Sequence, residues 1–462
     1  MVKDKSKIQA HDSILGTIGK TPLIYLHKVT AGYQGQYLAK IEFLNPGGSA
    51  KDRIGLDIIT EAEESGQLKS GGTIVEASSG NTAAGLAIAA AVKGYKTIFT
   101  MPDKISLEKI RLLRAYGAEV VLTPSTAPHN APDSHIEVAK RIVRETPNAI
   151  LANQYYNPKN IDTHYKTTGP EIWEQTGGQI DYFVAGIGTG GTISGAGKFL
   201  KEKNPDIKVI GVDPEGSVVR DVFYNRRAKP EGKPYKLEGI GQSFLPGTLH
   251  FKYIDEVVEV TDKESFIMAR RLTREEGMLV GGASGAVVAG LLKYAKNFKP
   301  EDVIVVLIPD TGNRYMSKIY SDDWMREHGY LTPEKVTLRY VLEVKKKDIP
   351  PIVSVSPQNT VRNALELIKE HNVSQLPVLE HNRCVGSIDE TVVMRKIIED
   401  ISTADKPVVE LMDEPFAELN IDDSVNQAIE LLTRKNAAIL VKEKNKYIGI
   451  VSRYDIIEYV TV

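Results

Sequence analysis

Residues 73–93, TIVEASSGNTAAGLAIAAAVK, contain the pattern on which the fold prediction depends. A short β-branched run comes first, a turn of small polar residues follows, and an alanine-rich stretch suited to a helix completes it. Strand, loop and helix in this order form the repeating unit of α/β proteins with parallel sheets. The loop comes at the carboxyl end of the strand, where such sheets bind their ligands.

The same alternation continues on both sides of this stretch, from about residue 37 to residue 310. Helices are expected over 50–64, 81–93 and after Gly191, and the remaining Val- and Ile-rich runs lack the polar alternation of a half-exposed strand. We therefore expect parallel strands covered on both faces. These strands are predicted at 37–42, 73–76, 97–100, 119–122, 181–186, 208–213 and 303–308.

The pattern changes after residue 325. Residues 326–350 are charged and contain prolines, which predicts a linker after a domain of residues 1–325. Two similar units of about 50 residues follow, at 351–400 and 407–462. Each has the order strand, helix, strand, turn, strand, helix, so we expect a module of two paired repeats.

Composition indicates a globular protein without a charged or membrane partner. The 462 residues are 42% hydrophobic and 26% charged, and the net charge of -2 provides no field that would attract nucleic acid. The first twelve residues are polar, and the longest apolar run, Ala84–Val92, is too short to span a bilayer. A single cysteine, Cys384, allows no internal disulfide and favours a reducing cytoplasm.

The first loop that could carry chemistry is Asn45-Pro-Gly-Gly-Ser-Ala-Lys51-Asp-Arg53, a turn that ends in a lysine where a helix begins. A helix start disfavours the ammonium form of lysine, and a neutral amine can form a Schiff base with an aldehyde cofactor. The alternative is a solvated surface lysine, because the chain has 58 lysines and arginines.

Two further loops lie between a strand and a helix. Residues 77–82, ASSGNT, offer small hydroxyls and helix-start amides to a carboxylate, although a capped tight turn explains them as well. Residues 186–192, GIGTGGT, allow a phosphate to approach the backbone; a structural glycine turn or a dinucleotide site are the alternatives. An aldehyde trap, a carboxylate site and a phosphate site together indicate pyridoxal phosphate with an amino-acid substrate.

Four motifs make the resemblance to a family plain: GKTPL (19–23), GGSAKDR (47–53), SSGNT (78–82) and GTGGT (188–192). They resemble the β-family of pyridoxal-phosphate enzymes, which has the tryptophan-synthase-like fold, fold type II. Other stretches are similar to the cystathionine β-synthase branch, namely 101–110, 211–217, 238–244 and 313–325, as is the C-terminal pair of CBS repeats. The resemblance implies a two-part open parallel-sheet α/β catalytic domain followed by a tandem CBS (Bateman) module.

The resemblance also implies roles for individual residues. Lys51 would bind the cofactor covalently and act as the base at the substrate's α-carbon. Asn81 would bond the cofactor's phenolic oxygen, and Ser284 would offer a hydroxyl to its pyridine nitrogen. The phosphate would be held by Gly188, Thr189, Gly190, Gly191 and Thr192, and the substrate by Ser78, Ser79, Thr82, Gln154, Tyr155 and Gln242.

The implied reaction is β-replacement, in which L-serine or O-acetylserine reacts with homocysteine to give cystathionine. Cysteine as the donor would release hydrogen sulfide. Some relatives have tyrosine where Gln242 stands, so a cysteine synthase that uses sulfide is the alternative. A protein of another class, a nucleotide sensor without catalysis, is disfavoured by the intact Lys51 and both ligand loops.

The resemblance implies no haem and no metal site, because the only cysteine, Cys384, lies in the C-terminal module. The second CBS repeat has the Gly-x-x-Ser-x-x-Asp run that reads an adenosine ribose, with Ser452 and Asp455 as the contacts. S-adenosylmethionine or an adenine nucleotide is the expected ligand, and a purely structural dimerising module is the alternative. A cytoplasmic homodimer or higher homo-oligomer is expected.

Overall fold

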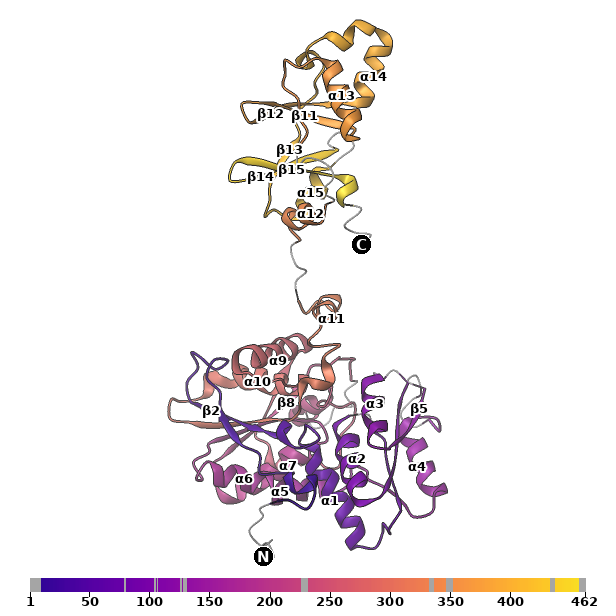
Figure 1. Ribbon diagram of the computed structural model, residues 1–462. Helices are drawn as coiled ribbons and strands as arrows, with labels where there is room; N and C mark the ends of the chain where they lie inside the picture. Colours follow the sequence, from indigo (N-terminus) through magenta and orange to yellow (C-terminus); the bar gives the residue numbers. More distant parts are fainter. Residues whose placement is uncertain are drawn as a thin grey trace, which may run out of the picture. The chain divides into compact units, whose positions relative to one another are not determined.

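The computed structural model describes residues 10–78, 80–103, 105, 107–124, 127, 131–225, 232–331, 336–345, 352–432 and 437–456. The chain divides into two compact units, Met1–Thr332 and Pro333–Val462 (Figure 1). The first unit contains two separate parallel sheets, and the second contains the repeated C-terminal segments.

The smaller sheet of the first unit has four parallel strands in the order β5-β4-β3-β6. They are β3 (Thr73–Glu76), β4 (Lys96–Pro102), β5 (Glu119–Thr123) and β6 (Ala149–Leu151). The helices of this part are α2 (Asn81–Lys93), α3 (Leu107–Ala115) and α4 (His135–Glu145). Ile74, Leu86 and Phe99 are fully buried in its core, so β3 lies inside the fold. A short loop, residues 77–80, connects β3 to α2.

The larger sheet has six strands in the order β1-β2-β10-β7-β8-β9, and only β1 runs antiparallel. The strands are β1 (Leu23–Tyr25), β2 (Gln36–Ile41), β7 (Tyr182–Gly186), β8 (Lys208–Pro214), β9 (Glu256–Val260) and β10 (Val303–Ile308). The central strands bury side chains on both faces, as their continuous apolar runs predict.

Helices cover both faces of this sheet, and each face has its own apolar cluster. On one face are α9 (Asp262–Glu276) and α10 (Gly282–Tyr294), and on the other are α5 (Lys159–Lys166), α6 (Thr168–Gln175) and α7 (Gly191–Lys203) (Figure 1). The remaining helices are α1 (Lys51–Glu64), α8 (Val219–Asn225) and α11 (Asp322–Glu327). Helix α1 packs against α2 and α5, so it connects the two sheets.

The second unit is built from two similar halves. The first half has α13 (Val361–His371), β11 (Gln375–Glu380), β12 (Arg383–Asp389) and α14 (Glu390–Glu399). The second half has β13 (Ala417–Asn420), α15 (Val425–Leu431), β14 (Ala438–Glu443) and β15 (Lys446–Ser452). Thr337 pairs with Ser424, and Thr360 pairs with Pro407 in the same way, so the segment before each half pairs with the helix start of the other.

The linker predicted over 326–350 needs a correction. Helix α12 (Leu338–Val344) lies inside that range, and Leu338 and Val341 are buried in the core of the second half. The helix is only seven residues long, and its charged and proline-marked flanks hide it in the sequence. Residues 336–345 therefore belong to the C-terminal unit.

Candidate active site

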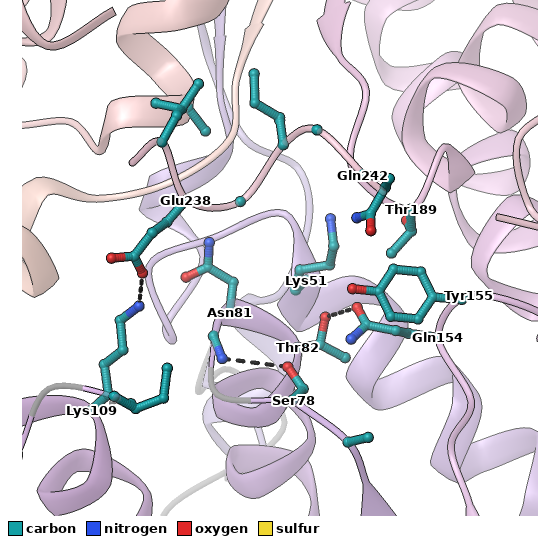
Figure 2. Close-up of a pocket in the computed structure, with 18 of the residues that line it drawn as sticks. Lys51, Ser78, Asn81, Thr82, Lys109, Gln154, Tyr155, Thr189, Glu238 and Gln242 are labelled. Atoms are coloured by element: carbon teal, nitrogen blue, oxygen red, sulfur yellow. Dashed lines mark hydrogen bonds and ion pairs between the residues drawn. The ribbon is translucent and has the colours of Figure 1, made fainter. Parts of the chain in front are cut away.

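A cavity of about 420 Å³ gathers the loops that follow the strands of both sheets in the first unit. Its wall includes the start of α1, the loop after β3, the loop after β7 and residues 235–242. Eight of the residues predicted from the sequence line it: Lys51, Ser78, Asn81, Thr82, Gln154, Tyr155, Thr189 and Gln242 (Figure 2). Ser79 lies outside the described residues.

Lys51 is the first residue of α1, and backbone contacts with the end of β10 fix the loop before it. The amide of Ala50 donates to the carbonyl of Pro309 at 2.9 Å, and the amide of Thr311 donates to the carbonyl of Gly48 at 3.0 Å. Burial lowers the pKa of Lys51, against the opposing effect of the Asp310 and Glu42 carboxylates. A neutral amine, the form that attacks an aldehyde, is therefore easier to reach here than on the surface.

Two glycines bring Lys51 close to the helix that carries Asn81 and Thr82. A Cβ on Gly55 of α1 would lie 2.5 Å from the carbonyl carbon of Gly85, and a Cβ on Gly85 of α2 would lie 2.5 Å from the carbonyl oxygen of Lys51. Backbone thus packs directly against backbone where the two helices cross. This close approach places the lysine and the 77–82 loop on one cavity.

Asn81 is held between a buried carboxylate and a guanidinium. Its Nδ2 donates to Oδ2 of Asp310 at 3.3 Å, and Arg314 donates to its Oδ1 and to the carbonyl of Gly47. Asp310 is fully buried, which raises its pKa, and it also accepts a bond from the Tyr315 hydroxyl at 2.9 Å. Arg314 and Asp310 therefore orient the amide of Asn81 beside Lys51.

Ser284, which was predicted to offer its hydroxyl to the cofactor, does not line the cavity. Ser284 is fully buried, and its hydroxyl donates to Asp310, with 3.1 Å to both the carbonyl oxygen and Oδ1. Ala283, the residue before it, lines the cavity instead. On helix α10 the neighbouring position points in a different direction, so an offset of one residue exchanges a cavity side chain for a core side chain.

The glycine-rich loop after β7 is shaped to accept a group against its backbone. Gly190 caps α7 with φ 86°, a conformation that other residues rarely adopt, and a Cβ there would lie 2.6 Å from Cα of Leu249. A Cβ on Gly188 would lie 2.6 Å from the carbonyl oxygen of Gly239. The loop opens the 13-residue helix α7, whose N-terminus favours an anion. The residues present therefore fit the phosphate of pyridoxal phosphate.

Buried side chains fix the two threonines of this loop. Thr189 accepts a bond from Asn160 at 3.0 Å, and Thr192 lies 3.0 Å from Nε2 of His164. Burial, together with the charges of Lys51 and Arg53, lowers the pKa of His164 to about 3, so this imidazole is neutral at physiological pH. Gly191 and Thr192 are buried at the helix start, whereas Thr189 reaches the cavity.

Side chains of the substrate-side wall are bonded to one another. The Thr82 hydroxyl donates to Oε1 of Gln154 at 2.6 Å (Figure 2). The side chains of Tyr155 and Gln242 are bonded as well. Ser78 accepts a bond from the amide of Gly80 at 3.4 Å. Tyr155 and Gln242 lie beside Thr189 of the glycine loop, so the predicted substrate and phosphate residues share one side of the cavity (Figure 2).

An ion pair on the far side of the cavity was not predicted from the sequence. Lys109 of α3 contacts Glu238 (Figure 2). Glu238 also accepts a bond from Lys318 at 2.7 Å. Burial alone would raise the pKa of Glu238, but the two ammonium groups outweigh it and hold the pKa below its usual range. Both residues lay in stretches quoted for their resemblance, MPDKISLEKI and EGIGQSF, which was the one available signal.

In the second unit, Asp455, the predicted contact for a ribose, already accepts hydrogen bonds from the protein itself. Oδ2 of Asp455 accepts bonds from the amide of Ser452 at 2.6 Å and from its hydroxyl at 2.7 Å. Lys345, close after α12, donates to the same oxygen at 3.0 Å. Across the described residues, no cluster of His, Cys, Asp and Glu could hold a metal ion, and no helix is long and apolar enough to cross a bilayer.

Comparison with known proteins assigns the site to a family. The model of the pyridoxal-phosphate-dependent enzymes matches residues 14–310, and the model of the CBS domain matches residues 346–399 and 408–462. The chain belongs to the pyridoxal-phosphate-dependent enzyme family. The predictions of an enzyme with this cofactor, of the α/β fold class and of a C-terminal CBS pair are therefore confirmed.

Some members of the family match nearly the whole chain, and others match about two thirds of it. The chain is 39% identical to cystathionine beta-synthase of Dictyostelium discoideum, over 97% of this chain and 92% of the relative. It is 42% identical to cysteine synthase of Staphylococcus aureus, over 68% of this chain and 98% of that protein. A crystal structure of a hydrogen sulfide-producing enzyme from Fusobacterium nucleatum matches with TM-score 0.61 and 36% identity, over 66% of this chain and all of the other.

Proposed function

We propose that this protein is a cystathionine β-synthase, which joins L-serine and homocysteine into cystathionine and releases water. The observation that carries the proposal is the cavity that brings Lys51, the 77–82 loop and the glycine loop together. Similarity to cystathionine beta-synthase over 97% of the chain supports this choice over cysteine synthase, which matches 68% of the chain.

Pyridoxal phosphate, when bound, draws electrons from the α-carbon of an attached amino acid, so that the α-proton becomes acidic and the β-substituent can leave. The residues of this chain bind it and control that proton. Thr189 and the backbone at 188–192 would hold the phosphate, and Asn81 would orient the ring. Lys51 would hold the aldehyde, and its lowered pKa suits it to take and return the proton at the α-carbon.

The remaining wall of the cavity selects the substrates. Ser78 and Thr82 would hold the donor's carboxylate, while Gln154, Tyr155 and Gln242 would border its side chain. The Lys109–Glu238 pair lies across from them. Its ammonium and carboxylate could pair with the carboxylate and ammonium of an amino-acid thiol. A zwitterionic acceptor such as homocysteine fits this charge pattern better than sulfide does.

Steady-state β-replacement tests the proposal directly. The protein, loaded with pyridoxal phosphate, is assayed with L-serine or O-acetylserine as donor and with homocysteine or sulfide as acceptor. Cystathionine from serine and homocysteine should form with the highest kcat/KM. A preference for O-acetylserine with sulfide would overturn the proposal in favour of a cysteine synthase.

The structural relative gives a second candidate activity. It is a hydrogen sulfide-producing enzyme, and it matches 66% of this chain at 36% identity. Cysteine in place of serine would release hydrogen sulfide by the same replacement, because only the leaving group differs. The rate of sulfide release from cysteine, with homocysteine as acceptor, is compared with the rate of cystathionine formation from serine. The ratio of the two rates shows which activity dominates.

The C-terminal unit is proposed to bind an adenosyl compound through Ser452 and Asp455, with S-adenosylmethionine as the first candidate. A cytoplasmic homodimer is proposed as the working form, on the basis of the family assignment and the single cysteine. Sedimentation of the purified protein tests the dimer. Isothermal titration with S-adenosylmethionine tests the ligand, and absence of heat would favour a structural role for the CBS pair.

A further inference from the structure

Glu76 is a buried carboxyl group directly beside the substrate loop, yet no step described so far uses it. It is the last residue of β3, two positions before Ser78, and it is 2% exposed. It does not line the main cavity but borders a second one of about 540 Å³, which shares Ala77 and Tyr155 with the first. A carboxylate in such a place is costly unless donors surround it.

The donors come from the loop that carries Gln154. The amide of Asn153 donates to Oε2 of Glu76 at 2.6 Å, and both the backbone amide and the side-chain amide of Gln154 bond the same carboxylate. Asn153 itself has φ 54°, a left-handed backbone conformation. The carboxylate therefore shapes the loop from which the substrate-side residues project.

The bond to Gln154 also fixes a direction. An ionised carboxylate only accepts hydrogen bonds, so the NH₂ end of the Gln154 side chain must face Glu76. Its oxygen then faces Thr82, whose hydroxyl donates to it at 2.6 Å (Figure 2). The one proton of that hydroxyl is consumed, and Thr82 can only accept a bond from a ligand in the cavity.

A neutral carboxyl group at position 76 reverses the direction of these hydrogen bonds. The protonated Glu76 has to donate its proton. The side-chain amide of Gln154 accepts it when the amide rotates so that its oxygen faces Glu76. The NH₂ end of Gln154 then donates to Thr82, and the Thr82 hydroxyl becomes free to donate into the cavity. A substrate carboxylate gains a hydrogen bond in this second state only.

We propose that Glu76 is a positioning residue whose charge sets, through the amide of Gln154, whether Thr82 donates toward the substrate carboxylate or away from it. The proposal rests on the proposed function only in that the ligand is an amino acid at the 77–82 loop. Burial raises the pKa of Glu76 to about 7, against the bonds from Asn153 and Gln154, so both states are accessible near neutral pH.

Other charged and titratable groups lie near Glu76. Glu137 and Lys140 of α4 line the second cavity with Glu76, but they pair with each other at 2.7 Å and so offset one another. Tyr155 and Tyr156, from the loop after β6, lie on the same wall, and burial raises the pKa of Tyr155 further from neutrality. Burial also raises the pKa of Asp52 and of Asp213 to about 7, and His135 lines the main cavity. Substitutions at positions 76 and 82 therefore have to separate Glu76 from these groups.

The test is binding of L-alanine to the full-length holoenzyme, read from the visible absorbance of the cofactor. Alanine carries the carboxylate but no leaving group, so neither the acceptor nor the product enters the measurement. The wild-type Kd should rise about tenfold as the pH increases through 7, the size expected for one hydrogen bond to a charged group. In Glu76→Gln the Kd should stay at the low value, because glutamine imitates the neutral state.

Two controls make the result specific. L-alanine methyl ester lacks the carboxylate charge, so Glu76→Gln should leave its Kd unchanged, and Glu137→Gln should keep the wild-type pH profile for alanine. Should Glu76→Gln fail to fold, Thr82→Val decides, because it removes the hydroxyl and must abolish the pH dependence near 7. Retention of the wild-type profile in either Glu76→Gln or Thr82→Val overturns the proposal. Failure to make cystathionine would leave this measurement unaffected.

Discussion

The amine of Lys51 is placed by its neighbours more than by its own side chain. The loop before it is bonded to the end of β10, and a glycine of α2 packs on its carbonyl oxygen. Lys51→Ala should therefore leave the thermal unfolding temperature nearly unchanged while it lowers β-replacement by about a thousandfold or more, since both the anchor and the base are lost. Steady-state kinetics and cofactor absorbance of the purified variant measure both effects. Activity near the wild-type level would remove Lys51 from the mechanism.

Ser284 should behave as a core residue and not as a cofactor ligand. Its hydroxyl bonds Asp310 and has no place in the cavity wall. Ser284→Ala removes one donor to a buried carboxylate, so the free energy of unfolding should fall by about 1–3 kcal/mol. The cofactor's visible spectrum should stay as in the wild type. A shifted spectrum with unchanged stability would restore the original prediction.

At the scale of single residues, sequence could predict the groups that belong to a local motif. Lys51, Asn81 and Thr82 follow strands and open helices, and this position is visible in the order of residues. Glu238, Lys109 and Glu76 gave no such signal, because each acts through a partner more than 70 residues away in the chain. Ser284 shows the related difficulty that the motif was visible but the direction of one side chain was not.

Helices α1 and α2 make the site possible through their glycine contact. Gly85→Ala places a methyl group 2.5 Å from the carbonyl oxygen of Lys51, so the helices must separate. Stability should fall by about 1–3 kcal/mol, the usual cost of an overpacked contact, and the affinity for pyridoxal phosphate should fall with it. Gly197→Ala in α7 is the matched control, because the nearest atom to its new Cβ lies at 3.4 Å, and alanine favours a helix. Equal effects of the two substitutions would contradict this role of the α1–α2 crossing.

Elements with a continuous apolar run were predictable, and short ones were not. The strands at 73–76 and 303–308 and the helix at 81–93 have the predicted bounds, since their residues are buried on both faces or nearly all around. Strand β6 has three residues, and β9, with the sequence EVVEV, carries two glutamates at the sheet edge; neither was predicted. Helix α12 was lost in a charged linker because only Leu338 and Val341 mark its buried face.

The C-terminal unit contains a contact that should oppose its proposed ligand. Lys345 bonds the carboxylate of Asp455, the group expected to read the ribose hydroxyls. Lys345→Ala removes this competitor, so the affinity for S-adenosylmethionine should increase about twofold to fivefold, the value of one partly exposed ion pair released on binding. Calorimetric titration of the variant beside the wild type measures it, with Asp455→Ala as the variant expected to bind nothing. Weaker binding in Lys345→Ala would mean that the lysine contacts the ligand itself.

For the whole molecule, the division into two units predicts that catalysis can be separated from the CBS pair. Every residue that lines the main cavity lies within Met1–Thr332, and that unit has both sheets and their own apolar clusters. A chain of residues 1–331 should therefore fold, bind pyridoxal phosphate and retain β-replacement, and S-adenosylmethionine should not change its activity or its unfolding temperature. The full-length protein assayed with and without S-adenosylmethionine is the control. An insoluble or cofactor-free fragment would show that the first unit needs the second to reach its active form, because the cavity's own residues are all present in both proteins.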